Sequence, residues 1–217
     1  MTEMSEKAKQ FWVLALASIA SCMVALDALV VTTALSSIRV GLGASLESLE
    51  WTVNAYNLSF AVLLLTGTAL GDRFGRRRMF CYGIGLFGGA SAACGLASNI
   101  GWLIAARALQ GAGAALVVPL AMALLGAAFP REERGRALGL FSGVTGIALI
   151  AGPVVGGAIA QGLAWQWIFW INLPIAIVLI PLVARRIDEN FGPSTALDIP
   201  GLALVTGSAL GLVWGLM

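Results

Sequence analysis

Long apolar runs separated by short polar or charged segments dominate this sequence. Residues 51–70 and 79–106 contain no charged side chain, and the octet Gly71-Asp72-Arg73-Phe74-Gly75-Arg76-Arg77-Arg78 lies between them. Each run is long enough to cross a bilayer as a helix, which requires roughly 20 apolar residues. Together with the other apolar runs, they predict membrane helices at about residues 11–35, 51–70, 79–97, 101–129, 137–160 and 167–183, with another beginning near residue 199. The pattern predicts an all-α polytopic membrane protein, with a six-helix bundle and part of a seventh transmembrane helix.

The distribution of basic residues predicts how these helices are oriented. If successive helices alternate in direction, eleven of the thirteen Lys and Arg residues fall on one side of the membrane. Lys and Arg in short loops mark the cytoplasmic side. We therefore expect a multi-pass protein of the cell (inner or plasma) membrane. Its expected parts are a cytoplasmic N-terminus at residues 1–10, a six-helix bundle at 11–183, a cytoplasmic link at 184–198 and the start of a seventh helix at 199–217.

Composition excludes several classes of function. Of the 217 residues, 59% are apolar and 11% are charged, whereas a soluble domain carries about 25% charged residues. The lipid bilayer is therefore an expected partner, and the net charge of +2 does not favour nucleic acid. The chain has no histidine, and its only lysines, Lys7 and Lys9, precede every glycine, so a Walker phosphate loop is excluded. Because no nucleophile–base set or metal-ligand spacing is present, we expect no enzymatic activity, no metal site and no cofactor.

Glycine is frequent, with 27 residues. Small residues let helix backbones approach closely in lipid. The segment Gly83-Ile84-Gly85-Leu86-Phe87-Gly88 matches the pattern G-x-G-x-x-G, but a dinucleotide site also requires a preceding strand. We predict a helix-packing face there.

Two ionisable side chains, Asp27 and Arg107, lie deep within apolar runs. Each costs about 2.5–3.5 kcal/mol on insertion scales, and such residues usually line cavities or proton paths. With a rise of ~1.5 Å per residue, Asp27 lies roughly 24 Å from the cytoplasmic end of its helix, and Arg107 roughly 9 Å from the outer end of its own. In a hydrocarbon core of about 30 Å these levels nearly coincide. We therefore expect the two side chains to share one polar cavity in the outer half of the bundle.

The expected role of Asp27 is to carry a proton. Burial disfavours a charged carboxylate, whereas a nearby arginine favours it. A carboxyl group balanced between these effects can load and release a proton, so a proton gradient is the expected energy source. A structural ion pair is the alternative interpretation.

Three motifs resemble the major facilitator superfamily and follow one another in the family's order. They are motif A at residues 70–78, motif B at residues 107–113, and the antiporter motif C at residues 152–157 with Gly139 upstream. Thr68 stands where motif A usually has its first glycine, and Ala148 replaces one glycine of motif C. The resemblance covers nearly the whole chain.

Three more segments resemble the fourteen-span drug:proton antiporters of this superfamily. Leu26-Asp27 is similar to their helix 1 motif, residues 165–174 to the start of their helix 6, and residues 197–201 to the start of their helix 7. Gln166 stands where arginine is common in that group. This resemblance implies a multidrug efflux antiporter that exports small amphipathic compounds in exchange for protons.

The resemblance also implies roles for individual residues. Proton coupling would depend on Asp27, Arg107 and Gln110. A cytoplasmic latch that biases the inward- and outward-facing states would consist of Gly71, Asp72, Arg73, Gly75, Arg76 and Arg77. The antiporter motif of helix 5, implied to seal the cavity against proton leak, would consist of Gly139, Gly152, Pro153, Gly156 and Gly157.

Residues at the outer end of the second helix are candidates for a substrate path. These residues are Trp51, Asn54 and Tyr56. Because interfacial aromatic residues are common in membrane proteins, anchoring at the membrane surface is the alternative.

The chain length bears on the function that we expect. A facilitator moves two halves about a site at their interface, and this sequence supplies six helices and part of another. We therefore expect the N-terminal half of a transporter about twice as long, with the missing C-terminal half as its partner. The alternatives are a non-transporting truncated membrane fragment and a facilitator that exports a single metabolite or sugar.

Overall fold

The computed structural model describes residues 5–162 and 164–192, together with single positions between residues 201 and 211. Within these residues the chain is helical and contains no strand. The helices are α1 (Glu6–Leu42), α2 (Leu46–Phe74), α3 (Arg76–Gly95), α4 (Ile100–Ala128), α5 (Arg131–Gly162), α6 (Trp167–Trp170) and α7 (Asn172–Arg186). The seventh transmembrane helix predicted at residues 199–217 lies outside the described residues, apart from those single positions.

The helices begin and end where local chemistry requires it. Ser45 caps α2 by accepting a hydrogen bond from the backbone nitrogen of Ser48 at 3.2 Å, and Asn99 caps α4 by accepting one from Trp102 at 2.8 Å. Such side chains satisfy backbone N–H groups that a helix start leaves unpaired. The turn between α1 and α2 contains Gly43 with φ 59°, a left-handed conformation that favours glycine. The helices extend beyond the apolar runs, and these caps and the glycine leave only short turns between them.

The charged octet, which lies between two predicted membrane helices, is itself mostly helical. Residues 71–74 end α2, residues 76–78 begin α3, and Gly75, with φ 103°, separates the two helices. The second charged segment behaves in the same way, because α5 begins at Arg131. Its first turn contains Glu132 and Glu133, and acidic side chains are favourable near the positive end of a helix dipole. Polar residues outside the membrane thus continue the helices.

The sixth apolar run forms two helices, α6 and α7, with Ile171 between them. Pro174 accounts for the interruption, because proline has no backbone N–H to pair with the carbonyl four residues earlier, at Trp170. Five described helices or helix pairs are long and apolar enough to cross a membrane. The helix α3 falls outside this set, because three arginines occupy its first turn and many small residues follow.

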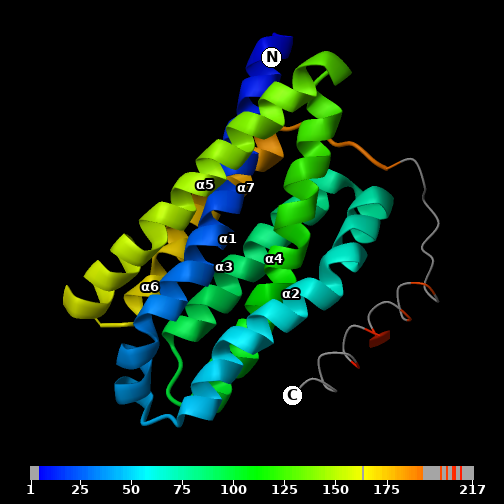
Figure 1. Ribbon diagram of the computed structural model, residues 1–217. Coiled ribbons are helices and arrows are strands. Elements are labelled where there is room, and N and C mark those ends of the chain that lie inside the picture. The colour runs from blue at the N-terminus through cyan, green and yellow to red at the C-terminus, as the bar shows by residue number, and fades with distance from the viewer. Residues whose placement is uncertain are drawn as a thin grey trace.

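The helix α4 is the centre of the bundle, with α2 and α3 packed along it, while α1 packs along α5 (Figure 1). Glycines make the contacts of α4 close. A Cβ at Gly113 would lie 2.6 Å from the backbone nitrogen of Phe87 in α3, and one at Gly111 would meet the backbone oxygen of Tyr56 in α2. Gly83 packs in the same way on Leu116. The predicted packing role of these glycines is confirmed.

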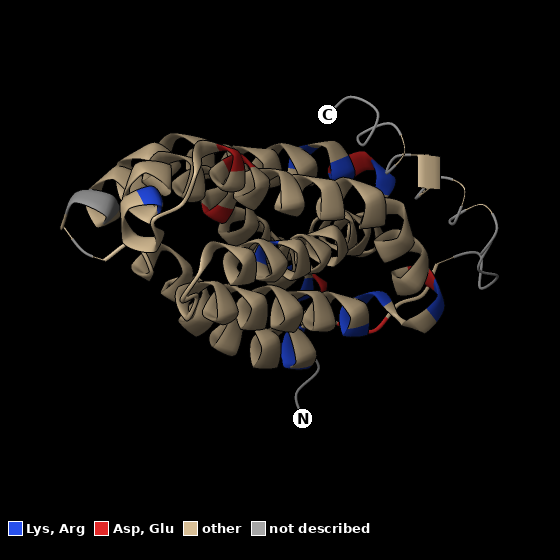
Figure 2. Cartoon of the chain, turned by 90° about the horizontal axis from the view of Figure 1, so that it is seen from below, with Lys and Arg blue, Asp and Glu red and all other residues tan. Residues whose placement is uncertain are grey.

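Charged residues of several segments meet at one end of the bundle. Lys9 near the start of α1 pairs with Asp188 at 3.1 Å, and Arg186 lies 4.7 Å from the ring centroid of Trp12. The start of α1, the end of α7 and the α2–α3 turn therefore gather at one end, as the predicted alternation requires. Most of the ribbon in Figure 2 is tan, and basic and acidic residues appear in a few separate patches.

Candidate functional site

A buried ion pair joins α1 to α4. The Arg107 guanidinium donates through Nη1 to Oδ2 of Asp27 at 2.6 Å. The side chains are 1% and 0% exposed. The prediction that these residues meet at one depth is confirmed.

Gln110, one turn beyond Arg107 on α4, completes one side of this pair. Its Nε2 donates to Asp27 Oδ1 at 2.8 Å, and its Oε1 accepts from Arg107 Nη1 at 2.7 Å. Gln110 therefore binds both charged groups at once. The structure brings together all three residues predicted for proton coupling.

Asn172 of α7 also binds Asp27, although the sequence analysis assigned it no role. Its Nδ2 donates to Asp27 Oδ1 at 2.8 Å and to Ser91 Oγ at 3.0 Å, and Ser91 in turn donates to the backbone oxygen of Phe169 at 2.8 Å. The signal in the sequence was an amide within the apolar stretch of residues 165–174. Asp27 thus accepts hydrogen bonds from Arg107, Gln110 and Asn172, and links α1 to α4 and α7.

The remaining surface of Arg107 is enclosed by neighbours. Its Nε donates to the backbone oxygen of Thr52 at 3.3 Å. Its guanidinium carbon lies 4.2 Å from the ring centroid of Tyr56 and 6.0 Å from that of Phe169. A cation over an aromatic face is attracted by the ring's electrons. Hydrogen bonds and aromatic rings together replace the water that a buried guanidinium loses.

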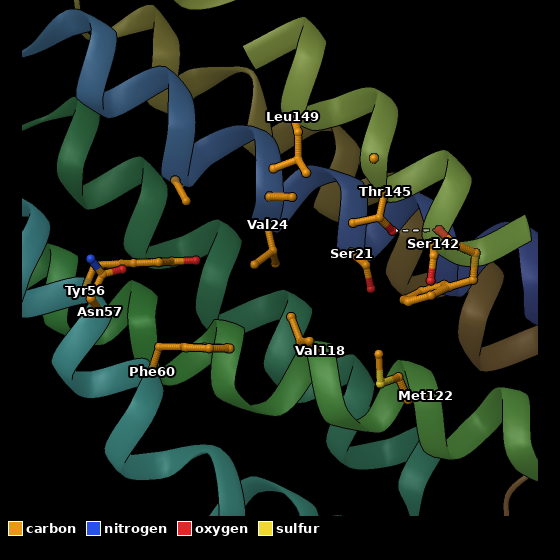
Figure 3. Close-up of a pocket in the computed structure, with 14 residues that line it drawn as sticks. Ser21, Val24, Tyr56, Asn57, Phe60, Val118, Met122, Ser142, Thr145 and Leu149 are labelled. Atoms are coloured by element: carbon orange, nitrogen blue, oxygen red, sulfur yellow. Dashed lines mark hydrogen bonds between the residues drawn. The ribbon is translucent and has the colours of Figure 1, made fainter. Parts of the chain in front are cut away.

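A cavity of about 430 Å³ lies beside this network, between α1, α2, α4 and α5. Figure 3 shows side chains from these helices converging on it, among them Val24, Phe60, Met122 and Leu149. Tyr56 lines the cavity and also contacts Arg107, so one side chain touches both the cavity and the ion pair.

Neither cavity described beside the ion pair is lined by both Asp27 and Arg107, so the expectation of a shared polar cavity is not confirmed. Neither residue lines the large cavity, because a buried ion pair is stable only when hydrogen-bond partners fill the space around it. Asp27 and Asn172 border a separate cavity of about 40 Å³ between α1, α5, α6 and α7, roughly the volume of one water molecule in the liquid.

Of the residues predicted for a substrate path, the structure places only Tyr56 at the large cavity. Trp51 and Asn54 lie half-buried on α2 and do not line it. The helix period explains the difference. Phe60 lies four residues after Tyr56 and three after Asn57, so these three residues share the face of α2 that lines the cavity.

The motif A residues form a second charge network, at the end of the bundle. Asp72 and Arg76 pair at 2.7 Å. Glu189 accepts from the backbone nitrogens of Arg77 and Arg78 at 2.8 and 3.3 Å, and so caps α3, whose own N-cap residue makes no such bond. Glu189 was not predicted from the sequence, because it lies more than a hundred residues further along the chain.

The other motif A residues have different positions. Gly71 packs on Leu120, and Gly75 forms the break between α2 and α3. Arg73 is exposed, with its guanidinium 5.3 Å from the ring centroid of Phe74. Arg73 therefore lies outside the network formed by Asp72, Arg76 and Glu189.

The antiporter motif of α5 divides into two groups. Gly152 packs against Leu29 of α1, and Gly156 against Val30 and Thr33, so α5 approaches α1 closely beside Asp27. Gly139 and Gly157 have no described atom near the position of an added Cβ, and Pro153 is exposed. Only part of the motif forms the α1–α5 contact within the described residues.

Comparison with known proteins agrees with this architecture. Residues 17–215 match a family model described as Major Facilitator Superfamily. The chain is 38% identical over 203 residues to the tetracenomycin C resistance and export protein of Streptomyces glaucescens, covering 90% of this chain and 37% of that protein. It is 39% identical over 210 residues to the puromycin resistance protein pur8 of Streptomyces alboniger, covering 95% of this chain and 41% of that protein.

Solved structures show the same fold at low sequence identity. A crystal structure of the peptide transporter POT superposes with a TM-score of 0.72 at 16% identity, covering 94% of this chain and 44% of that one. A D-xylose–proton symporter superposes with a TM-score of 0.65 at 16% identity, covering 95% of this chain and 53% of the symporter. The chain spans less than half the length of the two curated relatives described above.

Proposed function

Because the chain belongs to the major facilitator superfamily, we propose that it forms the N-terminal half of an exporter that moves small amphipathic compounds out of the cell in exchange for protons. Alternating access between two halves carries the substrate across. The chain lies in the plasma (inner) membrane with its N-terminus in the cytoplasm, and its partner is a C-terminal half of similar size. The relatives named for resistance and export support this direction of transport.

The observation that carries the proposal is the hydrogen-bonded network around Asp27 in a membrane-spanning helix. A carboxylate and a guanidinium each cost about 2.5–3.5 kcal/mol in the membrane on insertion scales, yet α1 and α4 bring both together. Three side chains bind the carboxylate: Arg107, Gln110 and Asn172. Ionisable groups in such places are usually functional.

Protonation of Asp27 changes what this network can hold together. A carboxylate accepts hydrogen bonds only, whereas a carboxylic acid also donates one. When a proton binds Asp27, the attraction to Arg107 is lost, and the new O–H requires an acceptor, for which Gln110 Oε1 lies in the same cluster. The contacts that join α1 to α4 and α7 are thereby exchanged. Proton loading from one side of the membrane and release to the other then biases two arrangements of the bundle.

The large cavity is the proposed site for the substrate. Its volume of about 430 Å³ lies within the roughly 300–1,000 Å³ typical of small-molecule sites. Tyr56 contacts both this space and Arg107, and therefore gives an occupied cavity a route to disturb the ion pair. Trp51 and Asn54, which do not line the cavity, are proposed to lie on the outer path by which a substrate reaches it.

The charge network at the α2–α3 turn is the proposed latch. Asp72, Arg76 and Arg77 are held to the segment after α7 through Glu189 and Asn190, and the exposed Arg73 is available to the C-terminal half. Charge pairs between rigid elements can form in one state and break in the other. We expect the 217-residue chain without a partner half to support no flux.

Replacing Asp27 by Asn tests this proposal. The amide keeps the size of the side chain but cannot carry the proton. In proteoliposomes that contain the complete transporter, we expect Asp27→Asn to lower pH-gradient-driven flux by at least about 10-fold, as loss of an essential proton carrier should. Glu132→Gln, which alters an exposed acid at the start of α5, is the matched control and should leave flux unchanged. Undiminished proton-driven flux in Asp27→Asn would refute the proton-coupling role.

A further inference from the structure

We infer that the cavity wall supplied by this chain selects uncharged, planar aromatic ligands, and that Ser21 binds a hydrogen-bonding group on them. This inference rests on the proposed function, because it takes the cavity as the substrate site. It adds a chemical class of substrate and a residue that selects it.

The cavity offers no charge to a ligand. Among the described residues that line it there is no Asp, Glu, Lys or Arg. The carboxylate of Asp27 does not line the cavity and is bound by three donors. A permanent cation that entered this space would lose its hydration without gaining a counter-charge, and an unpaired buried charge is strongly unfavourable. An uncharged ligand has no such loss of hydration free energy on entering the cavity.

The shape and chemistry of the lining favour flat rings. Tyr56 and Phe60 of α2 and Phe141 of α5 present aromatic surface, and Val24, Met122 and Leu149 complete an apolar wall. Aromatic rings prefer offset or edge-to-face contact with other rings. Methionine adapts to irregular ligands and makes favourable contacts with aromatic rings through its sulfur.

Ser21 supplies a polar group that awaits a partner. Its side chain is buried, with the residue 3% exposed, and its Oγ has no hydrogen-bond partner within the part of the chain that the structure describes. Figure 3 shows this hydroxyl directed into the cavity. The hydroxyl of Thr145, which also lines the cavity, already donates to the backbone oxygen of Phe141 at 2.9 Å. Since buried polar groups are normally paired, a ligand carbonyl or phenol is the natural partner of Ser21.

A matched pair of probes tests the charge selection. Hydroxyanthraquinone is uncharged, and N-methylacridinium is a permanent cation built on a ring system of similar size. Binding is measured by equilibrium dialysis against the purified 217-residue chain in nanodiscs. We expect the anthraquinone to bind at least about 10-fold more tightly. Equal or tighter binding of the acridinium, or binding of neither probe, overturns the inference.

Two serines on one helix test the role of Ser21. Ser18 is one turn earlier on α1, is also 3% exposed and also has an unpartnered hydroxyl among the described residues, but it does not line the cavity. Loss of one hydrogen bond predicts that Ser21→Ala weakens anthraquinone binding about 2- to 10-fold, whereas Ser18→Ala leaves it unchanged. Equal effects of the two changes, or none, would remove Ser21 from the site.

A third variant reverses the selection. Asn57 is exposed and lines the cavity, so Asn57→Asp adds a carboxylate there with little change in shape. We expect acridinium binding to tighten about 10-fold relative to anthraquinone binding, because an opposite charge now faces the cation. An unchanged preference contradicts the account of charge selection.

The outcomes distinguish this inference from the proposed function. If Asp27→Asn abolishes proton-driven flux while the cation binds best, only the ligand class is wrong. If the anthraquinone binds best but Asp27→Asn leaves flux intact, the proton coupling is wrong and the ligand class stands.

Discussion

The protein contains two clusters of arginine and acidic residues that differ in what surrounds them. The Asp27 carboxylate binds Arg107, Gln110 and Asn172, and the side chains of Asp27 and Arg107 are almost completely buried. The Glu189 side chain is 17% exposed, and that of its partner Arg78 is 66% exposed. The exposed cluster can therefore replace a lost partner with bulk water more easily than the buried cluster can. We expect the loss of one partner to cost more stability in the buried cluster than in the exposed one.

The largest effect is expected from removing one half of the buried ion pair. Arg107→Met leaves the Asp27 carboxylate buried with two amide donors and no counter-charge, which should lower stability by about 3–5 kcal/mol. Thermal unfolding in nanodiscs measures this loss. The double variant Asp27→Asn with Arg107→Met should be more stable than Arg107→Met, because no charge is left unpaired. A double variant that is less stable than both single variants would contradict the comparison.

An intermediate effect is expected at Asn172. Asn172→Ala removes a donor to Asp27 and another to Ser91, which should cost about 1–3 kcal/mol of stability. Because Asn172 also binds the group proposed to carry the proton, proton-driven flux should fall as well. Thr66→Ala, at a half-buried position of α2, is the control and should change neither quantity. A loss of stability with unchanged proton-driven flux would limit Asn172 to a structural role.

The sequence predicted the buried cluster better than the exposed one, for physical reasons. Charges in apolar runs are rare and expensive, so the depths of Asp27 and Arg107 were sufficient to bring them together. Asn172 was missed because an uncharged amide in an apolar run carries a much weaker signal. Glu189 was missed because its partners are backbone N–H groups of a distant helix start, which no side-chain pattern reveals.

The fold shows the same division. Apolar length predicted the helices, of which five are long and apolar enough to cross a membrane within the described residues, whereas α3, predicted at residues 79–97, is not. Glycine frequency predicted the close contacts of α4. Hydropathy did not locate the helix ends, because α2 and α3 continue through the charged octet to the single break at Gly75. The break within the sixth run follows from Pro174, whose effect depends on a missing hydrogen bond rather than on polarity.

The smallest effect is expected at the exposed cluster. Glu189→Gln removes the charge that faces the start of α3, which should cost about 0.5–1 kcal/mol because an acid near a helix N-terminus contributes that much and salt screens it. Hydrogen exchange should accelerate at the backbone amides of Arg77 and Arg78, and high salt should reduce the difference from the unmodified protein. Glu50→Gln, at an exposed position of α2, serves as the control. Unchanged exchange at these two amides would show that Glu189 does not hold the start of α3.

The most direct test of the central claim is whether ligand binding moves a proton on Asp27. Hydroxyanthraquinone is added to the complete transporter in weakly buffered solution, and a pH-sensitive dye reports the protons released. If proton and substrate bind competing states of the bundle, linkage predicts release of up to about one proton per ligand bound, and no release in Asp27→Asn. Equal proton release by both proteins would contradict the account.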